Sequence, residues 1–225
     1  MSKHDSTPKF PNSYLGNNSL DYDSSIWMER NQKKTTLLCL QYLYDERLDN
    51  LEKPDFLKDE PSFILDLGCG TGFSTEILVE RGFRVVGIDV LHDMISKVKP
   101  KKNLMINQNN LELILADINY IPLRNSSINH AISISVYNFI THRAESIRDK
   151  TKIANNTAKY LYKLLKPDGR IIIEFYPKDD NELEMFSSSF NTNGFNGFVV
   201  KQNPNQKSGQ TFLLLKKRCL NYRNM

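Results

Sequence analysis

Three aspartates follow three short apolar runs, and the first of them stands at the entrance of a glycine-rich stretch. This stretch reads LDLGCGTG, with Asp66 two residues before Gly68. Glycines at this spacing let the backbone approach a ligand between a strand and a helix. Asp89 ends the next apolar run, RVVGID, and Asp117 follows the third, LELILA. Carboxylates after neighbouring strands provide hydrogen-bond acceptors for one shared ligand.

The glycine spacing distinguishes between two classes of nucleotide ligand. A dinucleotide site reads G-x-G-x-x-G and presents a helix N-terminus to pyrophosphate, whereas this loop reads G-x-G-x-G behind a carboxylate. An acid at that point would repel phosphate but would suit a cationic amino-acid group, which places Asp66 on the amino-acid side. Asp89 can accept hydrogen bonds from two ribose hydroxyls. Asp117 can accept one from an adenine amino group, with Ile118 as an apolar wall. These properties describe S-adenosylmethionine.

Each aspartate taken singly has an ordinary structural interpretation. Asp66 could form a turn, Asp89 could cap a helix, and Asp117 could be a loop residue. Their joint offsets from the glycine loop favour the binding site.

Alternating strand and helix patterns position these residues. Helices are expected from about Phe73 to Gly82, near 91–98, over about 148–165 and over 179–192. GFVV and TFLLLKK, after the last helix, are expected to pair as a hairpin. The order predicts an α/β, Rossmann-like, doubly wound and mostly parallel seven-stranded sheet with an antiparallel C-terminal edge hairpin. The five preceding strands are SFILDL, RVVGID, LELILA, INHAISIS and IIIEF.

Four segments follow from the composition along the chain. Residues 1–23 are rich in Ser, Asn and Pro and predict a flexible arm, in which Tyr14 and Tyr22 could dock. Residues 24–61 form a helix and a linker, 62–217 the main domain, and 218–225 a short basic tail. The helix is expected to start at Ser24 or Ser25 and to bury an apolar face made of Ile26, Leu37, Leu40 and Leu43.

The overall composition is that of a globular protein. The 225 residues are 40% hydrophobic and 25% charged, and the net charge of +4 permits a polyanionic partner without requiring one. Cys39, Cys69 and Cys219 form no CxxC or Cys/His cluster, so neither a disulfide framework nor a metal site is expected. No apolar run has the length of a membrane span and the start is too polar for a secretory signal, so we expect the cytosol or nucleus.

A family resemblance extends this interpretation. FILDLGCGTGFS, GIDV, AISISVYNFI, EFYPKDDNELE and GFNGFVV together resemble the eukaryotic small-subunit (18S) ribosomal RNA guanine-N(7) methyltransferases, which are class I S-adenosylmethionine-dependent enzymes. The resemblance implies methylation of guanine N(7) during small-subunit biogenesis, with S-adenosylhomocysteine as the product. It also implies a nuclear and cytoplasmic location. The family carries a Gln-Trp pair where this chain has Asn138 and Phe139, and a long basic C-terminal extension where this chain has its short tail.

The candidate site has a cofactor half and a substrate half. SVYNF follows the fourth strand and FYP the fifth, so both should lie at the ligand crevice, where aromatics can stack on a base and an amide can bind its edge. Phe175 and Glu174 are expected to be structural, and His130 and His142 receive no role. No residue is assigned as an acid or base, since guanine N(7) already has a free lone pair. The substrate-side candidates are Tyr137, Asn138, Phe139, Tyr176 and Pro177, and the cofactor-side candidates are Tyr22, Asp66, Gly68, Cys69, Gly70, Gly72, Asp89, Val90, Asp117, Ile118 and Ser133.

The third strand predicts a protein partner. In the strand order of class I methyltransferases it lies at a sheet edge, yet LELILA lacks a proline or lysine that would protect an exposed edge. The resemblance implies that this partner is a small zinc-binding methyltransferase activator protein, paired through residues 111–116. The other expected partner is the small-subunit ribosomal RNA or the pre-ribosome.

Three other functions are compatible with parts of the pattern. Another methyltransferase, acting on transfer RNA or a small molecule, would share the cofactor half. A non-catalytic ribosome assembly module would keep the fold alone, although the intact set of Gly68, Gly70 and Asp89 argues against lost cofactor binding. A dinucleotide-dependent oxidoreductase is disfavoured by the glycine spacing and by Asp66.

Overall fold

The computed structural model describes residues 9–49, 62–203 and 209–218. Parts of the predicted arm (1–8), linker (50–61), hairpin loop (204–208) and basic tail (219–225) therefore lie outside the described residues, as does Cys219.

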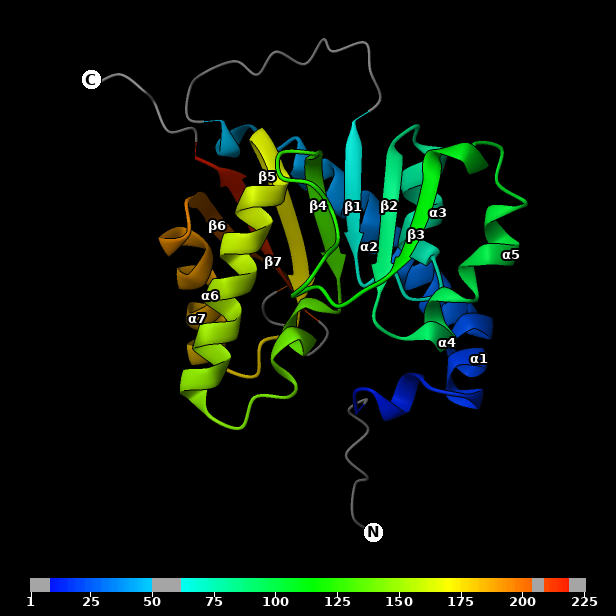
Figure 1. Ribbon diagram of the computed structural model, residues 1–225, viewed down its shortest axis with the longest axis horizontal. Helices are drawn as coiled ribbons and strands as arrows, with labels where there is room; N and C mark the ends of the chain where they lie inside the picture. Colours follow the sequence, from blue (N-terminus) through cyan, green and yellow to red (C-terminus); the bar gives the residue numbers. More distant parts are fainter. Residues whose placement is uncertain (1–8, 50–61, 204–208, 219–225) are drawn as a thin grey trace.

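Seven strands form one sheet in the order β3-β2-β1-β4-β5-β7-β6 (Figure 1). The pairs from β3 to β5 are parallel, whereas β7 is antiparallel to both β5 and β6. This confirms the predicted doubly wound sheet, its antiparallel hairpin and the edge position of β3. The strands are β1 (Phe63–Leu67), β2 (Arg84–Asp89), β3 (Leu111–Leu115), β4 (Ile128–Ile134), β5 (Leu165–Phe175), β6 (Phe195–Gln202) and β7 (Gln210–Lys217).

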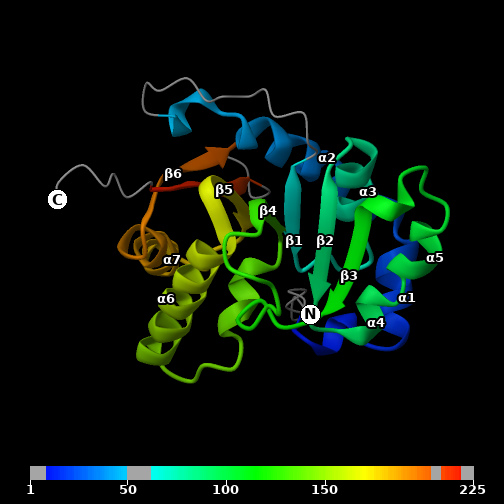
Figure 2. The same cartoon turned by 45° about the horizontal axis from the view of Figure 1, so that its top comes forward.

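Helices cover both faces of the sheet (Figure 2). One apolar cluster joins one face to α6 and α7, and a second joins the other face to α2 and α3. In β5, Ile173 and Phe175 face α6 and α7 while Ile172 faces α2, so the expected core position of Phe175 is confirmed. The helices are α1 (Asn17–Ser24), α2 (Ile26–Leu43), α3 (Phe73–Glu80), α4 (His92–Ile95), α5 (Val98–Lys102), α6 (Ile147–Leu164) and α7 (Asp180–Thr192), with short 3-10 turns η1 (Asn12–Tyr14), η2 (Glu46–Leu48), η3 (Gln108–Asn110) and η4 (Tyr137–Thr141).

Helix α2 buries the predicted Leu43 and packs Leu40 against the core, but its other buried residues differ from the predicted apolar face. Ser25 caps it as expected, but Ile26 is 81% exposed. The buried positions are Thr35, Thr36, Cys39 and Leu43. Small side chains let the helix lie close to the sheet, and the Thr36 hydroxyl donates to a carbonyl of its own helix at 2.7 Å. Residues of this helix are therefore buried because their small side chains fit against the sheet, as well as because some of them are hydrophobic.

Part of the arm predicted to be flexible is helical and packed. Helix α1 ends just before α2, and its Tyr22 ring stacks on Phe73 at a centroid distance of 6.1 Å. The Ser19 side chain is buried and donates to the Gly16 carbonyl. The aromatic contact compensates for a composition that by itself predicts disorder.

A buried ion network ties the end of α2 to the sheet, away from the glycine loop. The Arg170 guanidinium on β5 donates to the Asp49 carboxylate and, at 2.6 Å, to the Leu43 carbonyl. Lys216 on β7 donates to the same carboxylate at 3.1 Å. Burial and the Arg170 charge lower the pKa of the neighbouring His130 to about 4, so this ring stays neutral. Buried charges are tolerated here because each has a charged or carbonyl partner.

Replacing Arg170 should reveal the cost of breaking this network. Arg170→Met leaves Asp49 buried beside Lys216 alone, so we expect a loss of about 3–5 kcal/mol in the free energy of unfolding, measured by urea titration. The control is Lys201→Ala, which removes an exposed pair with Asp180 and should change this free energy by less than about 1 kcal/mol. Equal effects of the two substitutions would contradict the structural role of the network.

Candidate functional site: a ligand crevice at the carboxyl ends of the strands

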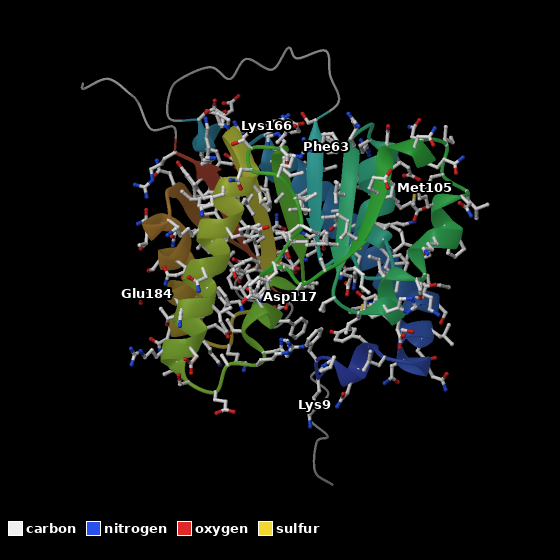
Figure 3. The ribbon with its side chains drawn as sticks, viewed as in Figure 1. Lys9, Phe63, Met105, Asp117, Lys166 and Glu184 are labelled. Carbon is white, nitrogen blue, oxygen red and sulfur yellow. The ribbon has the colours of Figure 1, made fainter. Side chains whose placement is uncertain are left out.

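The sheet order reverses between β1 and β4, and the carboxyl ends of these strands form the expected ligand crevice. Figure 3 places Asp117 at this end of the sheet and Phe63, the first residue of β1, at the opposite end. The glycine loop, the acid after each neighbouring strand and turn η4 all lie at the carboxyl end.

The glycine loop joins β1 to α3 in a conformation that requires glycine. Gly68, Gly70 and Gly72 have φ values of +75°, +55° and +91°. A Cβ atom on Gly68 would lie 2.3 Å from Cγ1 of Val136, a distance that no packed structure allows. The Cys69 amide donates to the Ile88 carbonyl at 2.8 Å, which fixes the loop against β2. The loop is therefore shaped by contacts on both neighbouring strands.

Asp66 lies behind this loop and fastens it to the helix. Its buried carboxylate accepts hydrogen bonds from the hydroxyls of Ser74 and Thr75, both at 2.7 Å, in the first turn of α3. Burial raises the pKa of Asp66 to about 6, and the two hydroxyls act in the opposite direction. Its hydrogen bonds to Ser74 and Thr75 are structural, so its effect on a ligand is that of a charge behind the loop.

Asp89 combines a structural and a ligand-directed role. One carboxylate oxygen accepts from the Gly70 amide at 2.9 Å and the other from the Leu91 amide at 2.8 Å. Burial raises the pKa of this carboxyl, and the three backbone amides around it act against that rise. Each oxygen has a further lone pair, so the pair can accept from two adjacent hydroxyls. Val90 beside it is 40% exposed and offers apolar surface.

Asp117 lies beside Asp89 because the Ala116 amide donates to the Asp89 carbonyl at 2.9 Å. One oxygen of Asp117 accepts from the amide and the side chain of Asn119, and Ile118 is buried against the core. The structure thus brings together the acids that sequence spacing predicted. Ser133 differs, because its buried hydroxyl donates to the Leu67 carbonyl and so ties β4 to β1. Cys69 is buried, and burial raises its thiol pKa.

The substrate-side candidates divide into core and crevice residues. Tyr137 is buried, and its ring packs against Phe186 and Phe190 of α7 with centroid distances of 5.5 Å. Asn138 holds its side-chain oxygen buried with no hydrogen-bond partner among the described residues. Phe139 is half-buried, and the ring of Phe10 stacks on it. Of this group, Asn138 and Phe139 have the chemistry that a planar, polar ligand requires.

Tyr176, half exposed just after β5, belongs to a hydrogen-bonded group around Glu174. The Glu174 carboxylate is fully buried and accepts from Ser135 at 2.8 Å, from Gln210 at 3.2 Å and from the Tyr176 hydroxyl. Burial raises the pKa of this carboxyl. Sequence analysis treated Glu174 as structural, and only the unusual acid inside an apolar strand could have drawn attention to it. Pro177 follows, half-buried, as the chain leaves the sheet.

The N-terminal residues cover the crevice, which sequence spacing could not show. Tyr22 lies over Phe73 at the start of α3, close enough to Asp89 and Glu174 for their charges to raise its pKa further than burial alone does. Lys101 donates to the Thr71 carbonyl at 2.9 Å and pairs with Asp23 of α1. Helix α1 therefore covers the glycine loop.

The arrangement fits S-adenosylmethionine better than a dinucleotide. It offers a glycine loop with no Cβ at the closest approach, paired acceptors at Asp89 and a further acceptor at Asp117. Buried negative charge at Asp66, Asp89 and Glu174 suits a cation and opposes a pyrophosphate.

Comparison with known proteins agrees with this geometry. A family profile described as "Methyltransferase domain" matches residues 65–173. The 18S rRNA (guanine(1575)-N(7))-methyltransferase of Saccharomyces cerevisiae is 31% identical over 188 residues, 83% of this chain and 62% of that protein. The chain is a homologue of the 18S rRNA guanine-N(7) methyltransferases. The names of these homologues agree with the resemblance that the motifs carry.

Two further homologues carry the same name, and one solved structure shares the fold. The 18S rRNA (guanine-N(7))-methyltransferases of Schizosaccharomyces pombe and Bos taurus are 29% and 28% identical over 69% and 70% of this chain. The chain spans 56% and 54% of their lengths, so it covers little more than half of these relatives. Geranyl diphosphate C-methyltransferase from Streptomyces coelicolor, 12% identical, superimposes with a TM-score of 0.62 over 85% of this chain and 81% of that one, which shows the shared fold.

The rest of the described chain bears on other kinds of functional site. A cavity of about 530 Å³ lies between β6, β7, α7 and η2, and it is lined by none of the candidate site residues. Among residues 9–49, 62–203 and 209–218, no group of three or more His, Cys, Asp or Glu side chains is placed to hold a metal ion. No described helix is long and apolar enough to cross a membrane.

Substituting Gly68 should show whether the close contact at this glycine, and not merely its positive φ, is needed for ligand binding. Gly68→Ala forces a Cβ into Val136, so we expect the affinity for S-adenosylhomocysteine to fall by about 10- to 100-fold in calorimetry. Gly82→Ala is the matched control, because Gly82 also has a positive φ but nothing lies within 4 Å of an added Cβ. An unchanged affinity in Gly68→Ala would show that the loop does not hold this ligand.

Proposed function

We propose that this chain is an S-adenosylmethionine-dependent methyltransferase that modifies guanine N(7) in small-subunit ribosomal RNA and supports assembly of that subunit. The observation that carries the proposal is the buried side-chain oxygen of Asn138, which has no hydrogen-bond partner among the described residues and lies in the turn that also carries Phe139, after the carboxyl end of β4. The names of the homologous yeast and bovine proteins point to the same substrate.

The amide oxygen of Asn138 favours guanine over adenine. Guanine carries N–H donors on its Watson–Crick edge, whereas adenine has an acceptor at the equivalent ring nitrogen. A guanine stacked on Phe139 with this edge at Asn138 directs N(7), on the opposite edge, away from the amide. Such stacking requires an unpaired or extruded base, as enzymes acting on bases generally do.

The chemistry needs placement more than proton transfer. When bound, S-adenosylmethionine supplies a methyl group on a sulfonium sulfur, which takes the bonding electron pair as the N(7) lone pair forms the new N–C bond. No proton leaves the guanine in this step, which agrees with the absence of an assigned acid or base. The task of the protein is to align the base, to exclude water and to surround the positive charge with acids. Glu174 and Asp66 are both buried, and we assign this electrostatic role to them.

The cofactor half follows from the geometry above. Asp89 would accept the ribose hydroxyls, Asp117 the adenine amino group, and the backbone of Gly68 to Gly72 would lie against the amino-acid part. Tyr22 would cover this half from α1. We place the protein in the nucleus and the cytoplasm, where small subunits are assembled.

The first experiment maps N(7)-methylguanine in small-subunit RNA from cells with and without the protein. We expect one guanine to lose its modification, and Asp89→Asn to fail to restore it because the acceptor pair is lost, with about 100-fold weaker binding of S-adenosylhomocysteine. Asp180→Asn, at an exposed carboxylate, is the control and should restore the modification. An unchanged methylation map would refute the assigned substrate.

We also propose that a small zinc-binding activator protein pairs with strand β3. This strand has β2 on one side, and in the described chain no strand lies on the other. Large apolar side chains surround this edge, with Leu104, Ile106, Leu115 and Tyr120 between 55% and 99% exposed. An apolar, unprotected edge of this kind is a site for strand addition.

A lysine at the edge should block this partnership. Leu115→Lys places a charge beside the open strand, so we expect co-purification with the activator to fall at least about tenfold. Ile147→Lys changes an apolar residue on α6 that is even more exposed than Leu115, and it should leave co-purification intact. Equal solubility and cofactor affinity of the chain with and without activator would count against the partnership.

A further inference from the structure

Residues 9–24, which we call the strap, cross the crevice and are anchored at their C-terminal half. The Gly16 amide donates to Asp93 at 2.6 Å, and Asp23 pairs with Lys101. Tyr22 stacks on Phe73 at the glycine loop. All three contacts lie on the cofactor half, so this half of the strap belongs to the cofactor site.

The other half of the strap ends on the substrate side. The Phe10 ring stacks on Phe139 with centroids 5.0 Å apart and an interplanar angle of 17°. It also meets the edge of His142 at 4.6 Å, and Tyr14 lies 6.1 Å from the same Phe139. Figure 3 shows Lys9 beyond the end of the sheet at which Asp117 lies.

Only aromatic contacts hold this end in place. The hydrogen bonds of residues 9–15 all remain inside the strap within the described part of the chain, for example from the Ser13 amide to the Lys9 carbonyl and from Asn18 to the Asn12 carbonyl. Opening this half therefore breaks no hydrogen bond to the methyltransferase domain. It loses ring contacts of the kind that a nucleobase would replace.

The spacing excludes a base between the two rings. Stacked layers are separated by about 3.5 Å, so a base held between Phe10 and Phe139 would need centroids about 7 Å apart. At 5.0 Å the two rings are in direct contact. A base that stacks on this face of Phe139 must therefore displace Phe10.

We propose that Phe10 is a built-in substitute for the substrate base, which occupies the stacking face of Phe139 and is exchanged for a guanine extruded from RNA. The identity of the base rests on the proposed function. The strap then closes the crevice when no base is present, and RNA binding opens only its N-terminal half. The apparent affinity for RNA is then the intrinsic affinity multiplied by the fraction of molecules that are open.

Removing the Phe10 ring should lower the KM for the RNA substrate. In Phe10→Ala we expect the KM for a guanine-containing small-subunit RNA fragment to fall by about 2- to 10-fold, the range that one aromatic pair provides. The kcat and the affinity for S-adenosylhomocysteine should not change, because the anchored half of the strap remains. Ile26→Ala, at an exposed residue of α2 outside the strap, is the control and should leave KM unchanged. A higher or unchanged KM in Phe10→Ala would overturn the proposal.

A second variant reports the exchange directly. Trp27 is the only tryptophan of the chain, so Phe10→Trp in a Trp27→Phe background places one fluorophore at the stack. Addition of the RNA fragment should shift its emission to longer wavelength as the ring enters water. Emission that is quenched without such a shift, or not altered, would contradict displacement.

Different results would refute the proposed function and the exchange of Phe10 for a base. A wild-type protein that methylates no guanine would refute the proposed function, whereas an active wild type with an unimproved Phe10→Ala variant would refute only the exchange. If the wild type is inactive, the fluorescence titration with the same RNA still decides whether a base displaces Phe10.

Discussion

The contact between Gly68 and Val136 is the constraint on which the site depends. The glycine loop follows β1, and Val136 is the residue before turn η4 at the end of β4. Because Val136 fills the place of a Cβ at Gly68, the loop that forms the cofactor half lies against the segment that carries Asn138 and Phe139. Neither half can shift without the other. The switch in strand order thus becomes a fixed distance between two reactants, which is what a methyl transfer without acid-base help requires.

The acids around this contact are held in place by short backbone and hydroxyl hydrogen bonds. Asp66 is fixed by α3, Asp89 by the amides of Gly70 and Leu91, and Glu174 by Ser135 and Gln210. Their burial raises each pKa, so ionising them inside the protein is costly until a cation is near. A cationic ligand relieves this cost, and the crevice is therefore selective by charge as well as by shape.

Sequence analysis predicted the sheet, the glycine loop and the position of the acids because these follow local rules of periodicity and spacing. It could not predict what the side chains contact. Tyr137 and Asn138 are adjacent in sequence, and each has a buried side-chain oxygen with no hydrogen-bond partner among the described residues, yet only the Tyr137 ring packs against Phe186 and Phe190 of α7. The strap was predicted only in part for the same reason. Its composition predicts a flexible arm in which Tyr14 and Tyr22 could dock, whereas its order comes from rings about 50 to 130 residues away, on Phe73 and Phe139.

Strand β5 shows how the fold separates stability from chemistry. Arg170 and Glu174 are both buried on this strand, four residues apart. Arg170 meets Asp49, and with Lys216 that network joins α2 to the sheet. Glu174 has no ion pair among the described residues and is surrounded by neutral donors. A paired charge serves the fold, whereas an acid with only neutral donors keeps most of its field for whatever enters the crevice. The carboxyl end of β5 is thus prepared for a positive charge that the folded chain itself does not supply.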